Sequence, residues 1–485
     1  MTLRARVMGS SLELKTLVTT FFVGAVCSIC LMFSSVPTSG LIAVVFFTAF
    51  LVYLLVKRPQ LYLLYLYVIF NIVTNVLGAV VCEYSSLYLA ELRINAHFVG
   101  SLPLLIFGRW TFVTILLIGD MIWNSDSEKR KEFPAEDGWI LRLATFGVAL
   151  ACVVMFASVA AKPAFLLHVD RFAYKANYLP KWADRLGSVM IYGAIVPILA
   201  IRRGDRMCRN LGFIGIVSYL FFLLWAGHKF GYLFYCFVFA IIVFYDDITA
   251  LLEKAKFQIF AFTVAVVAIL AMVAFVSTKN TFGIASPTEF FGARLAQQGQ
   301  LWWRTFEVTQ DEPYPEGFVN EIDALFMDRS DPSEYVGAQD GMWGIMYLTA
   351  PNEVVTNKIL TGSSYTECGH AAMYRYFGGI GVILFDIILG LIISLIGNCL
   401  LWAVRRGRVI DTLLLAKLFV ASWVVLSQFA FSGLVTGDVN VAAYLLFFIE
   451  WVYRSKSVHV FKLQNHPRLH GLEAPSVNGS KAVIP

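Results

Sequence analysis

The segments RLAQQGQLWWR (residues 294–304) and TGSSYTECGH (residues 361–370) lie near the two ends of a polar stretch that runs from 278 to 375. Two apolar runs, 259–277 and 380–404, flank this stretch. It contains 13 Asp and Glu residues against 6 Lys and Arg residues, which is too polar a mixture to cross a lipid bilayer. We therefore expect one large water-exposed loop between two membrane spans, with any chemistry located where the loop meets the bilayer.

Composition places the chain among integral membrane proteins. Of its 485 residues, 58% are hydrophobic and 15% are charged, and the mean hydropathy is +0.70, whereas soluble domains are less apolar and more charged. We expect an all-α protein with about twelve transmembrane helices. They are predicted at 17–33, 41–56, 61–82, 103–123, 140–160, 189–201, 211–226, 232–245, 259–277, 380–404, 413–434 and 441–453.

Basic residues predict how these helices are oriented. When the spans alternate between the two sides, the strongly basic segments fall on one side, which is expected to be cytoplasmic. They are 57–58, 129–131, 202–209, 254–256, 405–408 and the tail. Segments 83–101 and 161–188, the hairpin tip 227–231 and the large loop 278–376 fall on the other side. Helices 1–9 are thus predicted within 1–277 and helices 10–12 within 377–453, with a disordered cytoplasmic tail at 454–485.

Composition and motifs also exclude several classes of function. Because the basic residues follow the membrane pattern, they do not indicate a nucleic-acid partner. The sequence has no Walker A, Rossmann or HExxH pattern. Its eight cysteines lie mostly in or beside apolar runs, so they predict neither a disulfide framework nor a zinc site. No polar segment has paired metal-ligand spacing, and we expect a function without metal or cofactor.

Two short motifs suggest anion binding on the side opposite the basic loops. In GHKFG (residues 227–231), Lys229 is suited to holding a lipid phosphate, and His228 is a second titratable group at the same tight turn. In VDRFAY (residues 169–174), Arg171 is flanked by aromatic residues, including Tyr174, and suits a pyrophosphate or a sugar because guanidinium binds phosphate oxygens bidentately. The alternatives are a solvated turn for the first motif and a local contact of Arg171 with Asp170 or Tyr174 for the second.

The large loop supplies further candidates near its start. Arg294 and Gln298 share one face of a short predicted helix and are expected to contact a ligand. Trp303 could stack on a sugar, but the pair Trp302 and Trp303 fits better as an anchor that rests on lipid. Within the fourth predicted span, Arg109 is expected to extend its charge toward the membrane surface.

A general base is expected close to the end of the same loop. Glu367 and His370 precede the tenth predicted span, and either could accept a proton from a sugar hydroxyl. Glu91 and His97, in the segment 83–101, remain alternatives. Asp386 lies inside the tenth span and must face protein or water, where a structural partner is its expected role.

In these features the chain resembles the Wzy-type polymerases of bacterial surface polysaccharides. The resemblance rests on about twelve spans, cytoplasmic ends, a dominant periplasmic loop before the last three helices, and the segments VDRFAY, GHKFG, RLAQQGQLWW and YRYFGGIG (residues 374–381). It implies a GT-C-like fold in the bacterial inner membrane, with both termini cytoplasmic and the active site facing the periplasm.

The resemblance further implies an inverting, metal-independent glycosyltransferase that polymerises oligosaccharide repeat units linked to undecaprenyl pyrophosphate. Arg171, Lys229 and Arg294, with Arg375 as a fourth cation, would bind the pyrophosphate. Glu367, His370 or His228 would be the base, and Tyr174, Gln298 and Trp303 would contact the glycan. Membrane lipid and a protein that regulates chain length are the implied partners.

Two alternatives remain open at this point. An O-antigen ligase shares the architecture and the lipid-pyrophosphate donor but transfers the glycan to lipid A–core. A flippase or transporter would also have many spans, but it would place charges in the middle of the membrane along a pathway. The sequence places its charges mainly in loops, which favours the enzyme.

Overall fold

The computed structural model describes residues 3–124, 138–252, 254 and 287–445, apart from short gaps. These gaps are 168, 170, 229–230, 310–311, 326, 328–331, 362, 364, 432–433 and 435–443. Within the described residues the fold is almost entirely helical, and its two short strands form a single hairpin. This confirms the predicted all-α class.

Eight of the described helices are long and apolar enough to cross a membrane. They are α1 (Leu3–Met32, with its apolar part at Leu14–Met32), α2 (Pro37–Lys57), α3 (Pro59–Tyr84), α4 (Leu102–Asn124), α5 (Gly138–Ala160), α9 (Arg206–Trp225), α16 (Cys368–Arg406) and α17 (Val409–Gln428). Two bent pairs raise the number of candidate spans to as many as ten. The ninth predicted span, 259–277, lies outside the described residues, as does nearly all of the twelfth, 441–453.

The bent pairs differ from the straight spans that the sequence predicted there. Helix α7 (Lys181–Gly193) continues into α8 (Ile195–Arg203) at an angle of 45°, and α10 (Gly231–Val243) continues into Tyr245–Leu252 at 77°. The short sixth predicted span, 189–201, therefore covers the end of α7 and most of α8, and the break lies inside it. Its first turns were placed in a polar insert because Lys181, Asp184 and Arg185 lower the local hydropathy.

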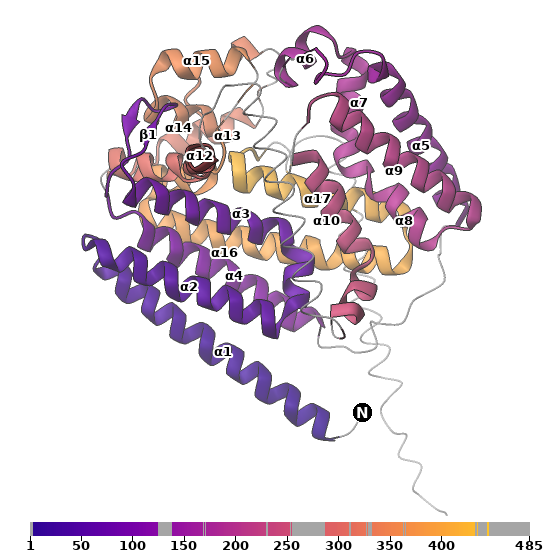
Figure 1. Cartoon of the computed structure of the whole chain (residues 1–485). Helices are drawn as coiled ribbons and strands as arrows, with labels where there is room; N and C mark the ends of the chain where they lie inside the picture. The colour runs from indigo at the N-terminus through magenta and orange to yellow at the C-terminus, as the bar shows by residue number, and fades with distance from the viewer. Residues whose placement is uncertain are drawn as a thin grey trace, which may run out of the picture.

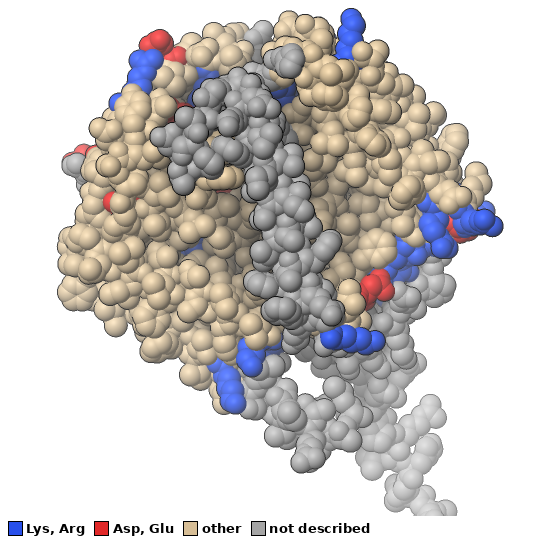
Figure 2. All heavy atoms as spheres, viewed as in Figure 1, with Lys and Arg blue, Asp and Glu red and all other residues tan. Residues whose placement is uncertain are grey.

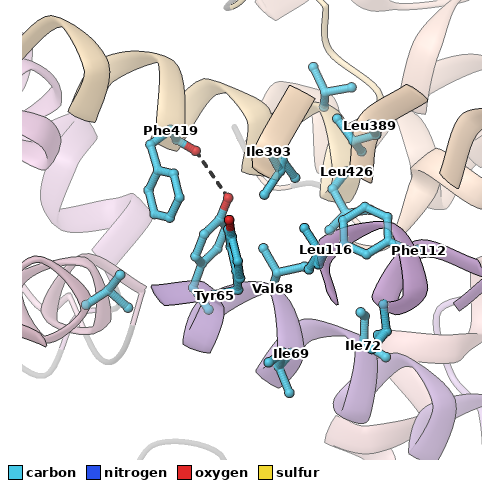
Figure 3. Close-up of a cluster of buried hydrophobic side chains, with 14 of the residues drawn as sticks. Tyr65, Val68, Ile69, Ile72, Phe112, Leu116, Leu389, Ile393, Phe419 and Leu426 are labelled. Carbon is cyan, nitrogen blue, oxygen red and sulfur yellow. Dashed lines mark hydrogen bonds between the residues drawn. The ribbon is translucent and has the colours of Figure 1, made fainter. Parts of the chain in front are cut away.

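One hydrophobic core joins α3, α4, α16 and α17. Figure 3 shows the centre of this core, where side chains from all four helices meet. The hydroxyl of Tyr67 on α3 donates to the backbone oxygen of Phe419 on α17 at 3.4 Å. A smaller buried cluster joins α5, α7 and α9. Figure 1 shows α1–α4 on one side of the molecule and α5–α9 on the other, with α10 and α17 between them.

The elements between the spans gather at one end, which we call the loop end. They are β1 (Tyr88–Leu89), β2 (Ile94–Asn95), α6 (Arg171–Asn177), α12 (Pro287–Thr309), α13 (Gly317–Ala324), the 3-10 helix η2 (Pro332–Tyr335), α14 (Gly341–Thr349) and α15 (Asn352–Leu360). The buried carboxylate of Glu83 secures the segment that enters α4, because it accepts from the backbone nitrogens of Val99, Gly100 and Ser101 at 2.6–3.0 Å.

The opposite end carries the basic turns, and we call it the arginine end. Arg405 at the end of α16 pairs with Asp246 at 2.6 Å, and the Arg203 side chain donates to the backbone oxygen of Arg405. Arg142 of α5 pairs with Asp205 at 2.7 Å. On the face drawn in Figure 2, the charged side chains of the described residues lie mainly toward the edges, and the described surface between them is largely uncharged, as a membrane-facing surface requires.

Helix α12 packs against α3 with its backbone. A side chain at Gly299 would overlap the backbone nitrogen of Ala79, and one at Gly78 would overlap the backbone oxygen of Leu295. Close approach of this kind needs glycine on both helices. It also buries Trp302 and Trp303 completely, so the expectation that this pair rests on lipid was wrong. Their indole nitrogens instead donate to the backbone oxygens of Ser101 and His97.

We predict that Gly299→Ala lowers stability by about 1–3 kcal/mol, because the added methyl group overpacks a backbone contact that cannot yield. Gly292→Ala is the matched control on the same helix, since a methyl group there meets nothing within 4 Å. It is expected to be neutral or to stabilise by up to about 1 kcal/mol. Thermal unfolding of the two purified variants in detergent measures the difference, and equal melting temperatures would contradict the packing described for α12.

Candidate functional site

A buried ion pair connects Glu367 with α3 and α4. Glu367 immediately precedes α16 in a left-handed conformation (φ 65°, ψ 41°), which is uncommon for a residue with a side chain. Its carboxylate accepts from Nη2 of Arg109 at 3.3 Å and from the side-chain amide of Asn71. The same Nη2 donates to Oδ1 of Asn75 at 2.8 Å. Arg109 and Glu367 are 0% and 3% exposed.

The expectation that Arg109 extends toward the membrane surface was therefore wrong. Arg109 lies seven residues into α4, about 10 Å along the helix at 1.5 Å per residue. A buried guanidinium without a counter-ion would cost several kcal/mol, and Glu367 supplies the counter-ion. The sequence could not indicate this pairing because the two residues are 258 positions apart.

A second buried pair lies within α16. Nε2 of His370 is 2.8 Å from both carboxylate oxygens of Asp386. In a straight helix, 16 residues would separate their backbones by about 24 Å. The two side chains meet because Gly378 breaks α16 with φ 62° and ψ −154°, a conformation that is essentially restricted to glycine. The first ten residues of α16 thus fold back beside the rest, and the expectation that Asp386 faces a protein partner is confirmed.

Burial dominates the electrostatics of Glu367. It raises the pKa of this carboxyl to about 7, while the charge of Arg109 and the hydrogen bonds from Asn71 and Arg109 act in the opposite direction. Both oxygens of Glu367 already have partners. In contrast, an imidazole that donates Nε2–H to Asp386 keeps Nδ1 as an acceptor, which is the arrangement of a general base oriented by a carboxylate.

This geometry separates the candidate bases that the sequence left open. His370 has the orienting carboxylate, whereas Glu367 is engaged with Arg109. Glu91 forms an ion pair with Lys358 at 2.7 Å, and His97 contacts Glu307 at 2.9 Å at the surface. We therefore take His370 as the stronger candidate and Glu367 as a member of its surroundings.

Helix α12 contributes Gln298 to the same region. Its backbone oxygen accepts from the Asn75 amide at 2.7 Å, and its side chain accepts from the Thr366 hydroxyl at 3.2 Å. Gln298 therefore lies beside the buried pairs, as its candidate role requires. The fully buried ring of Trp303 packs edge-on against His97 and leaves no face for a sugar, so a stacking role for Trp303 is not supported.

The two anion-binding motifs meet at the loop end. Gly227, with φ 79°, lies against the backbone of Arg171, and the backbone nitrogen of Ala164 donates to the oxygen of Trp225 at 2.8 Å. Burial lowers the pKa of His228 to about 4, and the nearby positive charges of Arg171 and Lys175 act in the same direction. His228 is thus neutral at neutral pH and beside an exposed arginine.

The remaining candidates lie in different surroundings. Tyr174 is buried and donates its hydroxyl to the backbone oxygen of Lys162 at 2.8 Å, which favours a structural role. Arg294 is exposed on α12, where it donates to Gln297 at 2.9 Å. The Arg375 guanidinium lies 5.2 Å from the centre of the Tyr314 ring. Lys229 lies outside the described residues.

Comparison with known proteins adds one match. Residues 336–438 match a family of unknown function, DUF6418, and this region is about a fifth of the chain. It includes Glu367, His370 and Asp386 but not Arg109. No curated protein and no solved structure matches the chain.

We predict that Gly378→Ala separates His370 from Asp386, because a side chain at this position strains the backbone conformation by about 1–3 kcal/mol. Gly379→Ala is the matched control, since the added methyl group makes only ordinary contact with Leu104. The expected result is a lower melting temperature for Gly378→Ala alone. If both variants have the melting temperature of the wild type, the fold-back of α16 does not depend on this glycine.

Proposed function

We propose that this chain is a membrane glycosyltransferase that polymerises oligosaccharide repeat units carried on undecaprenyl pyrophosphate. The observation that carries this proposal is the His370–Asp386 pair, an oriented base buried close to the loop end of the spans. Arg109 and Glu367 lie beside it. A buried acid–base group inside a membrane bundle indicates function more often than stability.

The proposed reaction uses a general base and a charged leaving group. Nδ1 of His370 takes the proton of an acceptor sugar hydroxyl, and that oxygen forms the new bond to the anomeric carbon of the donor. The bond from this carbon to the pyrophosphate oxygen breaks on the opposite face, which inverts the configuration, and the lipid pyrophosphate departs as an anion. Arg171 and Lys175 at the loop end supply positive charge for it, supported by Lys229, Arg294 and Arg375 in the same role.

The membrane arrangement that we propose rests on the candidate spans and on the distribution of basic residues. Up to ten described spans and the two predicted spans at 259–277 and 441–453 together make twelve, in a GT-C-like arrangement. The arginine end faces the cytoplasm, with both chain termini, and the loop end faces the periplasm of a bacterial inner membrane. A regulator of chain length is the expected protein partner.

One observation favours a second candidate function. Arg109, Asp120 and Asp386 lie inside spans and are at most 1% exposed, whereas the sequence suggested that charge is mainly confined to loops. Charges within spans are typical of transport pathways, so a transporter or flippase for the lipid-linked glycan is the alternative. An O-antigen ligase, which differs only in its acceptor, remains the alternative within the same reaction class.

We predict the lipopolysaccharide gel pattern of a strain that lacks this gene. Loss of a polymerase leaves core with a single repeat unit and no long ladder. Loss of a ligase leaves bare core and an accumulated periplasmic polymer on its lipid carrier, whereas loss of a flippase leaves bare core with single repeats on the cytoplasmic side. An unchanged ladder would overturn a role in O-antigen assembly.

We predict that Arg171→Ala, expressed in the same strain, reduces ladder synthesis by about 10-fold or more, because a charge-assisted contact contributes about 1.5–3 kcal/mol. Arg209→Ala is the control, since it removes the same charge from an exposed position at the arginine end and should restore the ladder. Equal amounts of both variants in the membrane must be verified by immunoblot. A full ladder with Arg171→Ala would exclude Arg171 from pyrophosphate binding.

A further inference from the structure

We propose that Arg109 is a positioning residue for the transfer reaction: its charge holds Glu367 in place and keeps His370 neutral, so that the imidazole can accept the proton. This inference rests on the proposed function, in which His370 is the base. From the sequence alone, Arg109 was expected to be only a charge near the membrane surface. Its place in the fold is instead at the junction of α3, α4 and the start of α16.

Arg109 contacts one buried pair directly, and its neighbour Gly108 lies against the other. Its Nη2 bridges Asn75 and Glu367 at 2.8 and 3.3 Å. The neighbouring residue Gly108 lies directly against Asp386, because a side chain at Gly108 would press on Oδ2 of that carboxylate. Arg109 thus reaches the Glu367 carboxylate directly, and the backbone beside it contacts the carboxylate that orients His370.

Arg109 supplies the positive charge that balances the carboxylates in the region of His370. Asp386 comes from α16, Glu367 from the turn before it and Arg109 from α4. The side chain that α12 brings to the His370 ring, Trp302, is neutral, and so are those that α3 brings to Glu367 and Arg109, Asn71 and Asn75. Without Arg109, the charge of the Asp386 carboxylate that contacts the imidazole would be unbalanced, which favours the protonated form of the imidazole. A protonated imidazole cannot act as the base.

The hydrogen bonding of Arg109 argues against a purely stabilising role. Among the described residues, its Nε and Nη1 have no hydrogen-bond partner although the side chain is 0% exposed. Buried donors without partners cost about 1–3 kcal/mol each, and a buried ion pair is often no more stable than an apolar replacement. Burial also raises the pKa of Glu367 to about 7. At neutral pH this carboxyl group is therefore close to the point at which it takes up a proton and the ion pair loses its negative charge.

The test measures polymerisation of lipid-linked repeat units by the purified full-length protein across pH 5–9. We expect Arg109→Gln to lower activity at pH 7 by about 10-fold or more and to move the rising limb of the pH profile upward by roughly one unit. Arg109→Lys keeps the charge and should retain the wild-type profile with reduced activity. The double variant Arg109→Gln, Glu367→Gln removes a carboxylate as well and should move the profile back.

A second readout does not depend on turnover. Nitrogen-15 NMR of labelled histidine follows the protonation of His370, assigned by its loss in His370→Asn, and the melting temperature in detergent verifies folding. If wild type does not polymerise, the proposed function fails, and the NMR titration decides the charge effect alone. An unchanged titration of His370 in folded Arg109→Gln, or an unchanged pH profile in an active variant, would overturn the role of Arg109.

Discussion

A charge can remain inside an apolar helix bundle only when an opposite charge and hydrogen bonds compensate for the lost water. The Arg109–Glu367 pair meets this requirement, and it does so with groups from three separate parts of the chain. Asn71 and Asn75 connect the pair to α3, and Asn75 continues the network to α12. The helices around this pair therefore cannot shift independently. The His370–Asp386 pair lies next to this network, because Gly108 of α4 lies against the Asp386 carboxylate.

Hydropathy predicted the membrane class and most spans because a helix that crosses a bilayer must be both long and apolar. It could not predict the 45° break after α7 and the 77° break after α10, since a bend leaves the average apolarity unchanged. Glu367 and His370 could be nominated from the sequence because polar side chains beside a span are conspicuous. Arg109 was missed because one arginine near the end of a span fits an exposed charge equally well. Only the three-dimensional fold reveals its partner.

The loop end brings together segments that the sequence could only treat separately. The insert that contains Arg171 and the tip that contains His228 are more than fifty residues apart, and Gly227 allows their backbones to touch. In contrast, the tryptophans of α12 showed the limit of motif interpretation. Aromatic residues in a polar segment are equally typical of a lipid anchor, a sugar platform or a core. Here the glycine contact between α12 and α3 buries the tryptophans, so they belong to the core.

The break at Gly378 also determines how α16 can enter a membrane. As one straight helix, its 39 residues would measure about 58 Å, roughly twice the thickness of the hydrocarbon core. Only the part after Gly378 needs to be inserted as a span, while the part that bears His370 can be translocated in water and dock afterwards. Biosynthesis can thus assemble a buried polar centre without passing its histidine through lipid.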